Sequence, residues 1–122
     1  MQHRLRQHAD YQRVYKAGRK QFAKQMAYFF AMRAADAPSP TTGPRIGLTV
    51  PKALGKAVDR NRIKRRLREA IRRALPLLSV PVDVVLHPRR TTLTLDFPII
   101  EQEVAEVFRA IQKRCAPAPS SK

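Results

Sequence analysis

The pattern of apolar and polar positions predicts two strands in the first half of the chain. In segment 26–32, a set of large apolar residues alternates with a second set made of Phe29 and the alanines on either side of it. Because successive strand residues point to opposite faces of a sheet, we expect the first set in the core and Phe29 on the other face. There the Phe29 ring either offers an open platform for stacking or covers a helix, and the pattern favours the two arrangements equally.

The segment 45–50 has the same two-faced character. Its apolar residues alternate with Arg45, Gly47 and Thr49, so its second face carries small and polar side chains. Glycine inside a strand often marks the close approach of another backbone or of a ligand. A third strand, at 82–86, is apolar almost throughout, which is typical of a central position in a sheet.

Helical spacing of apolar residues predicts three helices around these strands. The first is expected from Asp10, as its N-terminal cap, to about Lys16, with Gly18 as the residue that ends it. The second covers about 56–75 and ends before a proline. The third follows Asp96, which is again a suitable cap.

The order of elements is therefore α-β-β-α-β-α, which predicts an α/β two-layer sandwich with a small sheet. The length of 122 residues suits one domain. We expect this single domain to occupy residues 1–115, with a proline-rich loop at 34–44. Residues 116–122 are expected to form a disordered tail.

The charge balance says what kind of partner to expect. The formal net charge is +16, and the usual neutraliser of such an excess is nucleic acid or an anionic membrane. The sequence has no lipidation motif, and its longest apolar run, at 26–32, is far too short to span a bilayer. We therefore expect no membrane partner. The single cysteine, Cys115, fits a reducing, cytoplasmic setting.

The second predicted helix carries much of this charge. From Arg60 to Arg73, eight of fourteen residues are Lys or Arg. Ile63, Leu67 and Ile71 recur at helical spacing and form one stripe that faces the core. A merely solvated helix gains from opposite charges one turn apart, but acids are scarce here. The polar side of the helix is therefore predicted to contact a polyanion.

Residues suited to catalysis are scattered along the chain. The three histidines show no arrangement for acid–base catalysis, the acids form no pair placed for metal-assisted hydrolysis, and no glycine-rich phosphate loop is present. We assign no catalytic, cofactor-binding or metal-binding residue to the protein itself.

Binding of nucleic acid is the function that the residues alone support best. Cations contact phosphates, and the aromatic residues among them can stack on unpaired bases. Asn61, between Arg60 and Arg62, adds a hydrogen-bond acceptor to a row of donors. It either caps the helix or contacts RNA. On charge and size alone, a ribosomal or other structural RNA-binding protein is the alternative.

The segment 45–73, RIGLTVPKALGKAVDRNRIKRRLREAIRR, closely resembles the signature of the bacterial ribonuclease P protein subunit. The family pattern has an Arg-x-Gly-Leu strand, a Lys-x-x-Gly-x-Ala-Val turn and then Arg-Asn-Arg-x-Lys-Arg-x-x-Arg. The resemblance extends to the opening helix, which ends at Gly18, and to Asp83 in the last strand. It covers nearly the whole chain except the proline-rich loop and the tail.

The resemblance implies a protein cofactor of an RNA enzyme. Members of the family bind a large catalytic RNA, and the complex removes the 5′ leader from precursor tRNA with magnesium ions held mainly by the RNA. The resemblance also implies a monomer bound to one catalytic RNA, and it allows two holoenzymes to pair. The implied fold is a mixed sheet of the ribosomal-protein-S5-domain-2-like class with a left-handed βαβ crossover.

The resemblance assigns two sets of binding residues. The set expected to bind the catalytic RNA is Lys52, Lys56, Arg60, Asn61, Arg62, Lys64, Arg65 and Arg68. The set expected to bind the leader is Tyr11, Tyr15, Phe29, Arg45 and Thr49.

This chain departs from the family pattern in three places. Tyr11 and Tyr15 stand where phenylalanine is usual, which keeps stacking and adds a hydroxyl group. Lys56 stands where asparagine is usual, so that turn is expected to contact phosphate. His87 lies in a stretch that replaces the usual polar and basic ending of the last strand.

Overall fold

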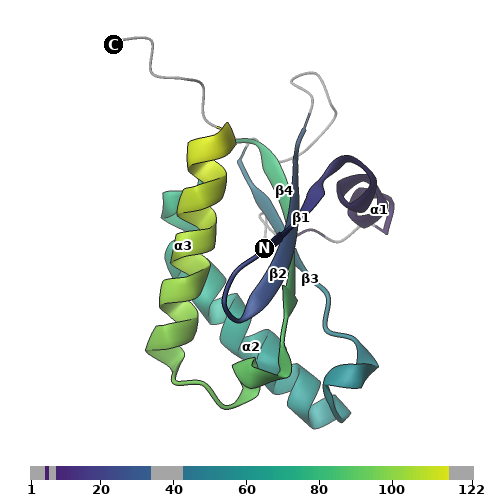
Figure 1. Cartoon of the computed structure of the whole chain (residues 1–122), viewed down its shortest axis with the longest axis vertical. Helices are drawn as coiled ribbons and strands as arrows, with labels where there is room; N and C mark the ends of the chain where they lie inside the picture. The colour runs from purple at the N-terminus through teal and green to yellow at the C-terminus, as the bar shows by residue number, and fades with distance from the viewer. Residues whose placement is uncertain (1–4, 6–7, 34–42, 116–122) are drawn as a thin grey trace.

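Helices cover both faces of a four-stranded mixed sheet (Figure 1). The computed structural model describes residue 5 and residues 8–33 and 43–115. The helices are α1 (His8–Ala17), α2 (Ala57–Ala74) and α3 (Phe97–Cys115). The strands are β1 (Arg19–Phe22), β2 (Met26–Met32), β3 (Arg45–Leu48) and β4 (Val82–Pro88). Short 3-10 turns are η1 (Lys52–Leu54), η2 (Leu75–Leu77) and η3 (Arg90–Leu93).

The sheet has the strand order β1-β2-β4-β3. Strand β2 is antiparallel to β1 and to β4, whereas β3 and β4 are parallel. Two parallel neighbours need a long crossover connection, and α2 lies in it. Strand β4 is central, and its residues 82–86 are all buried. The prediction of a central apolar strand at this place is therefore confirmed.

Strand β1 is absent from the predicted order of elements. Its sequence, RKQF, has three polar residues out of four and shows no alternation. Because it lies at the edge of the sheet, it pairs only with β2, through its backbone, and its side chains need not be apolar. The observed order is therefore α-β-β-β-α-β-α.

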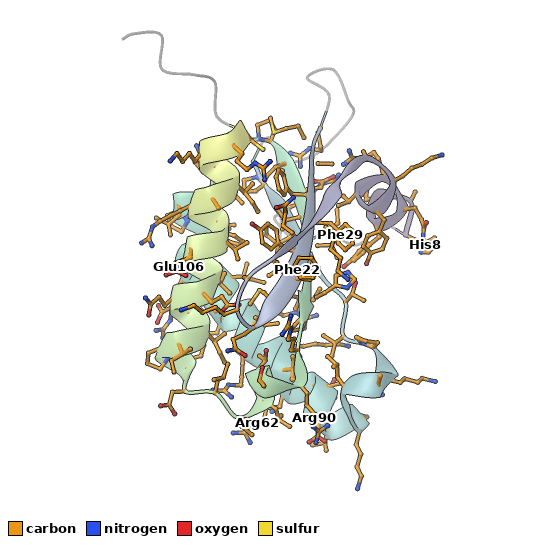
Figure 2. All side chains as sticks on the ribbon, viewed as in Figure 1. His8, Phe22, Phe29, Arg62, Arg90 and Glu106 are labelled. Carbon is orange, nitrogen blue, oxygen red and sulfur yellow. The ribbon has the colours of Figure 1, made fainter. Side chains whose placement is uncertain are left out.

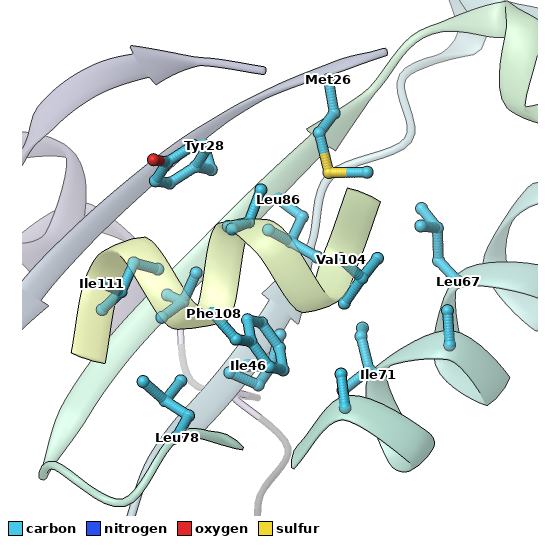
Figure 3. Close-up of a cluster of buried hydrophobic side chains, with 14 of the residues drawn as sticks. Met26, Tyr28, Ile46, Leu67, Ile71, Leu78, Leu86, Val104, Phe108 and Ile111 are labelled. Carbon is cyan, nitrogen blue, oxygen red and sulfur yellow. The ribbon is translucent and has the colours of Figure 1, made fainter. Parts of the chain in front are cut away.

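The main hydrophobic core lies between the sheet and the pair α2 and α3 (Figure 3). The stripe predicted for the basic helix is confirmed, because Ile63 and Leu67 are fully buried. Phe108 of α3 is fully buried as well. On the sheet side, the core takes Met26 and Tyr28 of β2, with Phe30 packed against them, as the alternation predicted. Met32, which the alternation also assigned to the core, is 43% exposed, because it ends β2 beyond the pairing with β1. Thus α2 is held in place by its apolar side while its cations face outward.

Helix α1 covers part of the other face of the sheet. Val14 of α1, Leu5 and Val85 of β4 form a second apolar cluster, against which Phe29 packs. The two-layer arrangement predicted from sequence describes the sheet with α2 and α3, and α1 adds a partial third layer (Figure 1). On this face Phe29 is half-buried beside the helix. Its ring is therefore neither a fully open platform for stacking nor fully covered by the helix.

Two predicted boundaries of α1 have different causes from those expected. Asp10 is not the cap, because it lies in the first turn of a helix that begins at His8. Gly18 follows the helix, but it is required by contact, since a Cβ there would lie 2.5 Å from the backbone oxygen of Phe30. The predicted loop at 34–44 lies outside the described residues except for 43 and 44, and the predicted tail, 116–122, lies entirely outside them.

Candidate nucleic-acid interface

The residues predicted to bind the catalytic RNA form one continuous surface at η1 and along α2. Six of them are exposed and two, Arg60 and Lys64, are half-buried. We call this surface the α2 face; it consists of Lys52, Lys56, Arg60, Asn61, Arg62, Lys64, Arg65 and Arg68. Figure 2 shows Arg62 at the outer end of α2, with its side chain directed away from the sheet.

The start of α2 is shaped by a turn that only glycine fits easily. Gly55 has a φ angle of 139°, a backbone conformation that residues other than glycine rarely adopt. The Arg60 Nε group donates to the Gly55 carbonyl oxygen at 3.2 Å, and Arg90 Nη1 donates to that of Leu54 at 2.7 Å. These two arginines fix the turn that presents Lys56 at the head of the α2 face.

Asn61 is not the helix cap. The N-cap position of α2 is Lys56, which makes no side-chain capping bond, and Asn61 lies more than one turn into the helix with its side chain exposed. Of the two roles left open by the sequence, capping is therefore excluded. Contact with a partner is the role consistent with this position.

Some arginines of α2 serve the fold. Arg66 Nη1 donates to the carbonyl oxygens of Thr92 at 2.9 Å and Leu93 at 2.8 Å, and Nη2 donates to that of Leu95. Arg66 therefore ties η3 to α2. Two cavities of about 580 and 440 Å³ adjoin it, and Arg62 lines both of them.

Near the C-terminal end of α2, acids balance part of the charge. Glu69 accepts hydrogen bonds from Arg72 and Arg73, and these bonds lower the pKa of its carboxyl group to about 2. Arg73 also lies 3.6 Å from the carboxylate of Glu101 on α3. Arg72 and Arg73, near the end of the helix, are thus paired with acids, and neither belongs to the α2 face.

The residues predicted to bind the leader come together on the opposite face of the sheet. Three of them form a compact aromatic and polar group around α1. The rings of Tyr15 and Phe29 meet edge to face with centroids 5.0 Å apart, and the Tyr15 hydroxyl is hydrogen-bonded to Thr49 Oγ1 at 2.8 Å. We call this surface the α1 face; its predicted members are Tyr11, Tyr15, Phe29, Arg45 and Thr49.

His87 joins this group, although no role could be predicted for it from the sequence. Its Nε2 lies 3.1 Å from the Tyr15 hydroxyl, and its ring centroid lies 5.2 Å from that of Phe29. Burial lowers the pKa of His87, and the nearby charge of Lys20 lowers it further. The imidazole is therefore neutral at pH 7. Parity along β4 could have indicated this position, because Asp83, Val85 and His87 share one face.

Tyr11 explains the glycine in β3. A Cβ at Gly47 would lie 2.5 Å from the Tyr11 hydroxyl oxygen, and this hydroxyl donates to the Leu5 carbonyl oxygen at 3.2 Å. The close neighbour of Gly47 is therefore a tyrosine of α1. The part of this face near Gly47 is thus filled by the protein, and half-buried rings lie near Tyr15, toward the C-terminal end of α1.

Arg45 takes part in a buried ion-pair network. Its Nε and Nη2 donate to the two carboxylate oxygens of Asp83 at 2.9 and 2.8 Å, and its Nη1 lies 3.3 Å from Asp10. Arg33 donates to the same carboxylate at 2.6 Å, and Arg13 also pairs with it. The Arg45 side chain is only 14% exposed, so its evident role is to join α1 and β3.

The pKa of Asp83 reflects this network. Burial alone would raise the pKa of the carboxyl group, but the hydrogen bonds from Arg45 and Arg33 outweigh burial and hold the pKa below its usual value. Asp83 is completely buried. It therefore stays ionised at neutral pH and fixes the arginines around it.

Comparison with known proteins decides the class of this interface. Residues 1–112 match the model of the family described as Ribonuclease P. The chain belongs to the ribonuclease P protein family. The protein is thus a component of the endoribonuclease that processes tRNA, and RNA binding is its family function. The resemblance seen in the sequence is confirmed.

Relatives and solved structures agree along most of the chain. The ribonuclease P protein component of Finegoldia magna is 34% identical over 92% of this chain and 94% of its own length. That of Symbiobacterium thermophilum is 38% identical over 87% and 88%. The solved structure of the Staphylococcus aureus RNase P protein is 27% identical, covers 91% of this chain and 95% of its own, and has a TM-score of 0.72.

The structure of the RNase P protein from Thermotoga maritima is 24% identical, covers 88% of this chain and 96% of its own, and has a TM-score of 0.74. This likeness bears on the fold alone.

Within the part of the chain that the structure describes, no helix is long and apolar enough to cross a membrane.

Proposed function

We propose that this ribonuclease P protein binds the catalytic RNA through its α2 face and the 5′ leader of precursor tRNA through its α1 face. The observation that supports this division is the layering of the fold. Helices α1 and α2 lie on opposite faces of one sheet, so a single chain presents two separate surfaces (Figure 1). One surface is rich in exposed cations, and the other combines aromatic rings with hydrogen-bonding groups.

The α2 face suits the backbone of a folded RNA. Cations that neutralise phosphates release counterions, which gives binding without dependence on base sequence. The core stripe of α2 fixes the helix against the sheet, and Arg60, Lys64 and Arg68 recur at a spacing of four along it. Asn61 can donate and accept at once, so it suits a base edge or a ribose 2′-hydroxyl.

The α1 face suits unpaired nucleotides. Stacking of bases on aromatic rings tolerates any sequence, because every base has a flat face. Tyr15 and Phe29 supply the rings, and Thr49 lies within hydrogen-bond distance of Tyr15. Arg45 and Tyr11 contribute by positioning α1 against the sheet as well as by any contact they make with RNA.

We further propose that the RNA subunit carries the chemistry and holds the magnesium ions. Two carboxylates of the protein are already bound by cations, since arginines bind the buried Asp83 carboxylate and two more bind Glu69. Among residues 8–33 and 43–115, no three His, Cys, Asp or Glu side chains gather where they could hold a metal ion. In this proposal the protein contributes no catalytic residue.

The proposal extends to assembly, location and topology. We propose that one copy of the protein binds one catalytic RNA and that two such holoenzymes can pair. We place the complex in the cytoplasm. We also propose that the crossover from β3 through α2 to β4 is left-handed, as in the ribosomal-protein-S5-domain-2-like class, and that residues 1–115 form a single domain. The parallel pairing of β3 with β4 is consistent with this topology.

The RNA that co-purifies with the tagged protein tests the proposed partners. We expect the ribonuclease P catalytic RNA together with precursor tRNA that still carries its leader. Recovery of ribosomal RNA alone would instead support the alternative of a structural RNA-binding protein.

A further inference from the structure

The most exposed aromatic ring of the described sheet lies outside both predicted sets. Phe22, the last residue of β1, is 68% exposed and is not part of either apolar cluster. The Lys20 ammonium group lies over its ring, 5.4 Å from the centroid. Figure 2 shows the Phe22 side chain at the front of the sheet, in the same region as that of Phe29. Neither packing nor the proposed function explains why this ring stays in solvent.

The strand register places Phe22 on the α1 face of the sheet. Phe22 is the partner of Ala27, and Ala27 is in turn the partner of His87 on β4. Lys20 is the partner of Phe29. Because paired residues on neighbouring strands share a face, Phe22 and Lys20 extend the surface that holds Phe29 and His87.

Ala27 is the small residue in this row of side chains. It carries only a methyl group, with Phe22 on one side of it and His87 on the other. Phe29 is the next residue of β2 on the same face. Aromatic rings therefore surround a small residue on the α1 face, and the row leads from the Tyr15 group to the edge of the sheet.

The charges at this edge indicate which partner the ring meets. Lys20 and Lys24 flank Phe22 and are both exposed. Lysines on an edge strand oppose pairing with a further strand, which disfavours a protein partner that adds to β1. A cation beside an exposed aromatic ring is instead the combination that binds single-stranded nucleic acid, with a phosphate on one group and a base on the other.

We propose that Phe22 and Lys20 form an additional binding site for an unpaired nucleotide of the precursor leader. The base stacks on the Phe22 ring and its phosphate pairs with the Lys20 ammonium group. We place this nucleotide farther from the cleavage site than those held near Tyr15 and Phe29, because the row of side chains ends with Phe22 on the edge strand of the sheet. The inference rests on the proposed function, because it lengthens the path of the leader across the α1 face.

A tryptophan at this position gives a direct readout. The sequence contains no tryptophan, so Phe22→Trp introduces a single fluorescent reporter on an exposed site. The variant holoenzyme is titrated with precursor tRNA that carries a long leader, a short leader or no leader. We expect the long leader alone to quench the fluorescence. Ile99→Trp is the matched control, because Ile99 is 46% exposed on α3, and its signal should stay unchanged.

Affinity measurements complete the test. Phe22→Ala should weaken binding of the long-leader precursor by about five-fold or more, which is the lower end of the range for loss of one stacked base, and leave the short-leader precursor unaffected. Lys20→Ala should reduce the slope of log affinity against log salt by about 0.7 for the long leader. Equal affinity of wild type and Phe22→Ala for the long leader, or equal quenching by leaderless tRNA, would overturn the inference.

The two proposals fail in different ways. If the wild-type holoenzyme binds precursors equally well with and without a leader, the proposed role of the α1 face is wrong and this inference falls with it. If wild type prefers the long leader and both Phe22 variants show the same preference with no quenching, only the additional site is wrong.

Discussion

Phe29 is packed by the protein yet left half-exposed, so the ring has a structural role and keeps surface for the binding role proposed for it. It meets Tyr15 and His87 on one side, while its position on the α1 face leaves the rest of the ring for a base. A substitution must therefore separate loss of packing from loss of stacking.

We expect Phe29→Ala to weaken binding of the leader by about 1–3 kcal/mol and to leave binding of the catalytic RNA nearly unchanged. Phe29→Leu is the matched control for packing, because it keeps an apolar side chain without an aromatic face. It should recover stability but not leader affinity. The measurement is the affinity of each variant for precursor tRNA with and without a leader, and recovery of affinity by leucine would contradict stacking.

His87 gives the α1 face a dependence on pH. Its folded pKa is below the ordinary value of 6.5 because of burial and Lys20. The unfolded chain therefore binds a proton at higher pH than the folded protein does. Stability from this group is present above the ordinary pKa and is lost as pH falls below it. Denaturant unfolding at pH 7.5 and 5.5 should show this loss, and His87→Gln should reduce it. An unchanged pH dependence in the variant would exclude His87 as its source.

Among the elements, α1 is tied to the sheet by charge as much as by apolar contact. Arg13 of α1 and Arg45 of β3 both bind the buried carboxylate of Asp83 on β4, and Arg33 binds it from the end of β2. Breaking a buried ion pair by removal of one partner is costly, because the other charge stays buried.

Asp83→Asn should therefore destabilise the protein by about 3–5 kcal/mol. Because the folded pKa of Asp83 is lowered, the stability it contributes is present above its unfolded pKa and is lost as pH falls through the folded value. The test is the unfolding free energy of both proteins from neutral to acidic pH. Glu69→Gln, which removes an exposed ion pair, is the control and should change stability far less. Equal losses in the two variants would contradict the network.

Helix α2 carries cations that build the fold beside cations that we propose to contact RNA. Arg65 is exposed, whereas the neighbouring Arg66 binds three carbonyl oxygens around η3. Arg65→Ala should weaken assembly with the catalytic RNA and lower the salt slope by about 1, with no change in melting temperature. Arg66→Ala should lower the melting temperature. The account of α2 fails if both variants lose stability equally while RNA affinity is unaffected.

At the scale of the whole molecule, local patterns predicted most elements but not the contacts between them. The apolar stripe of α2 and the central strand β4 follow from periodicity, because burial of side chains is their main constraint. Strand β1 did not follow, because an edge strand is held by backbone hydrogen bonds and its polar sequence carries no alternation.

For the candidate site as well, the sequence predicted residues but not all of the contacts between them. Sequence placed Tyr15, Phe29 and Thr49 in one group, and the structure brings them together. The sequence could not show that Arg45 pairs with Asp83 or that His87 completes the group. Both depend on the strand register between distant segments. Phe22 was missed for the related reason that its strand was missed.

This chain is the protein component of a ribonuclease P, and we propose that the catalyst of the complex is RNA. The most direct test is cleavage of precursor tRNA at low magnesium concentration by the protein, by the catalytic RNA, and by the two together. We predict removal of the leader at the mature 5′ end by the mixture alone. Cleavage at that position by the purified protein without RNA would contradict the claim.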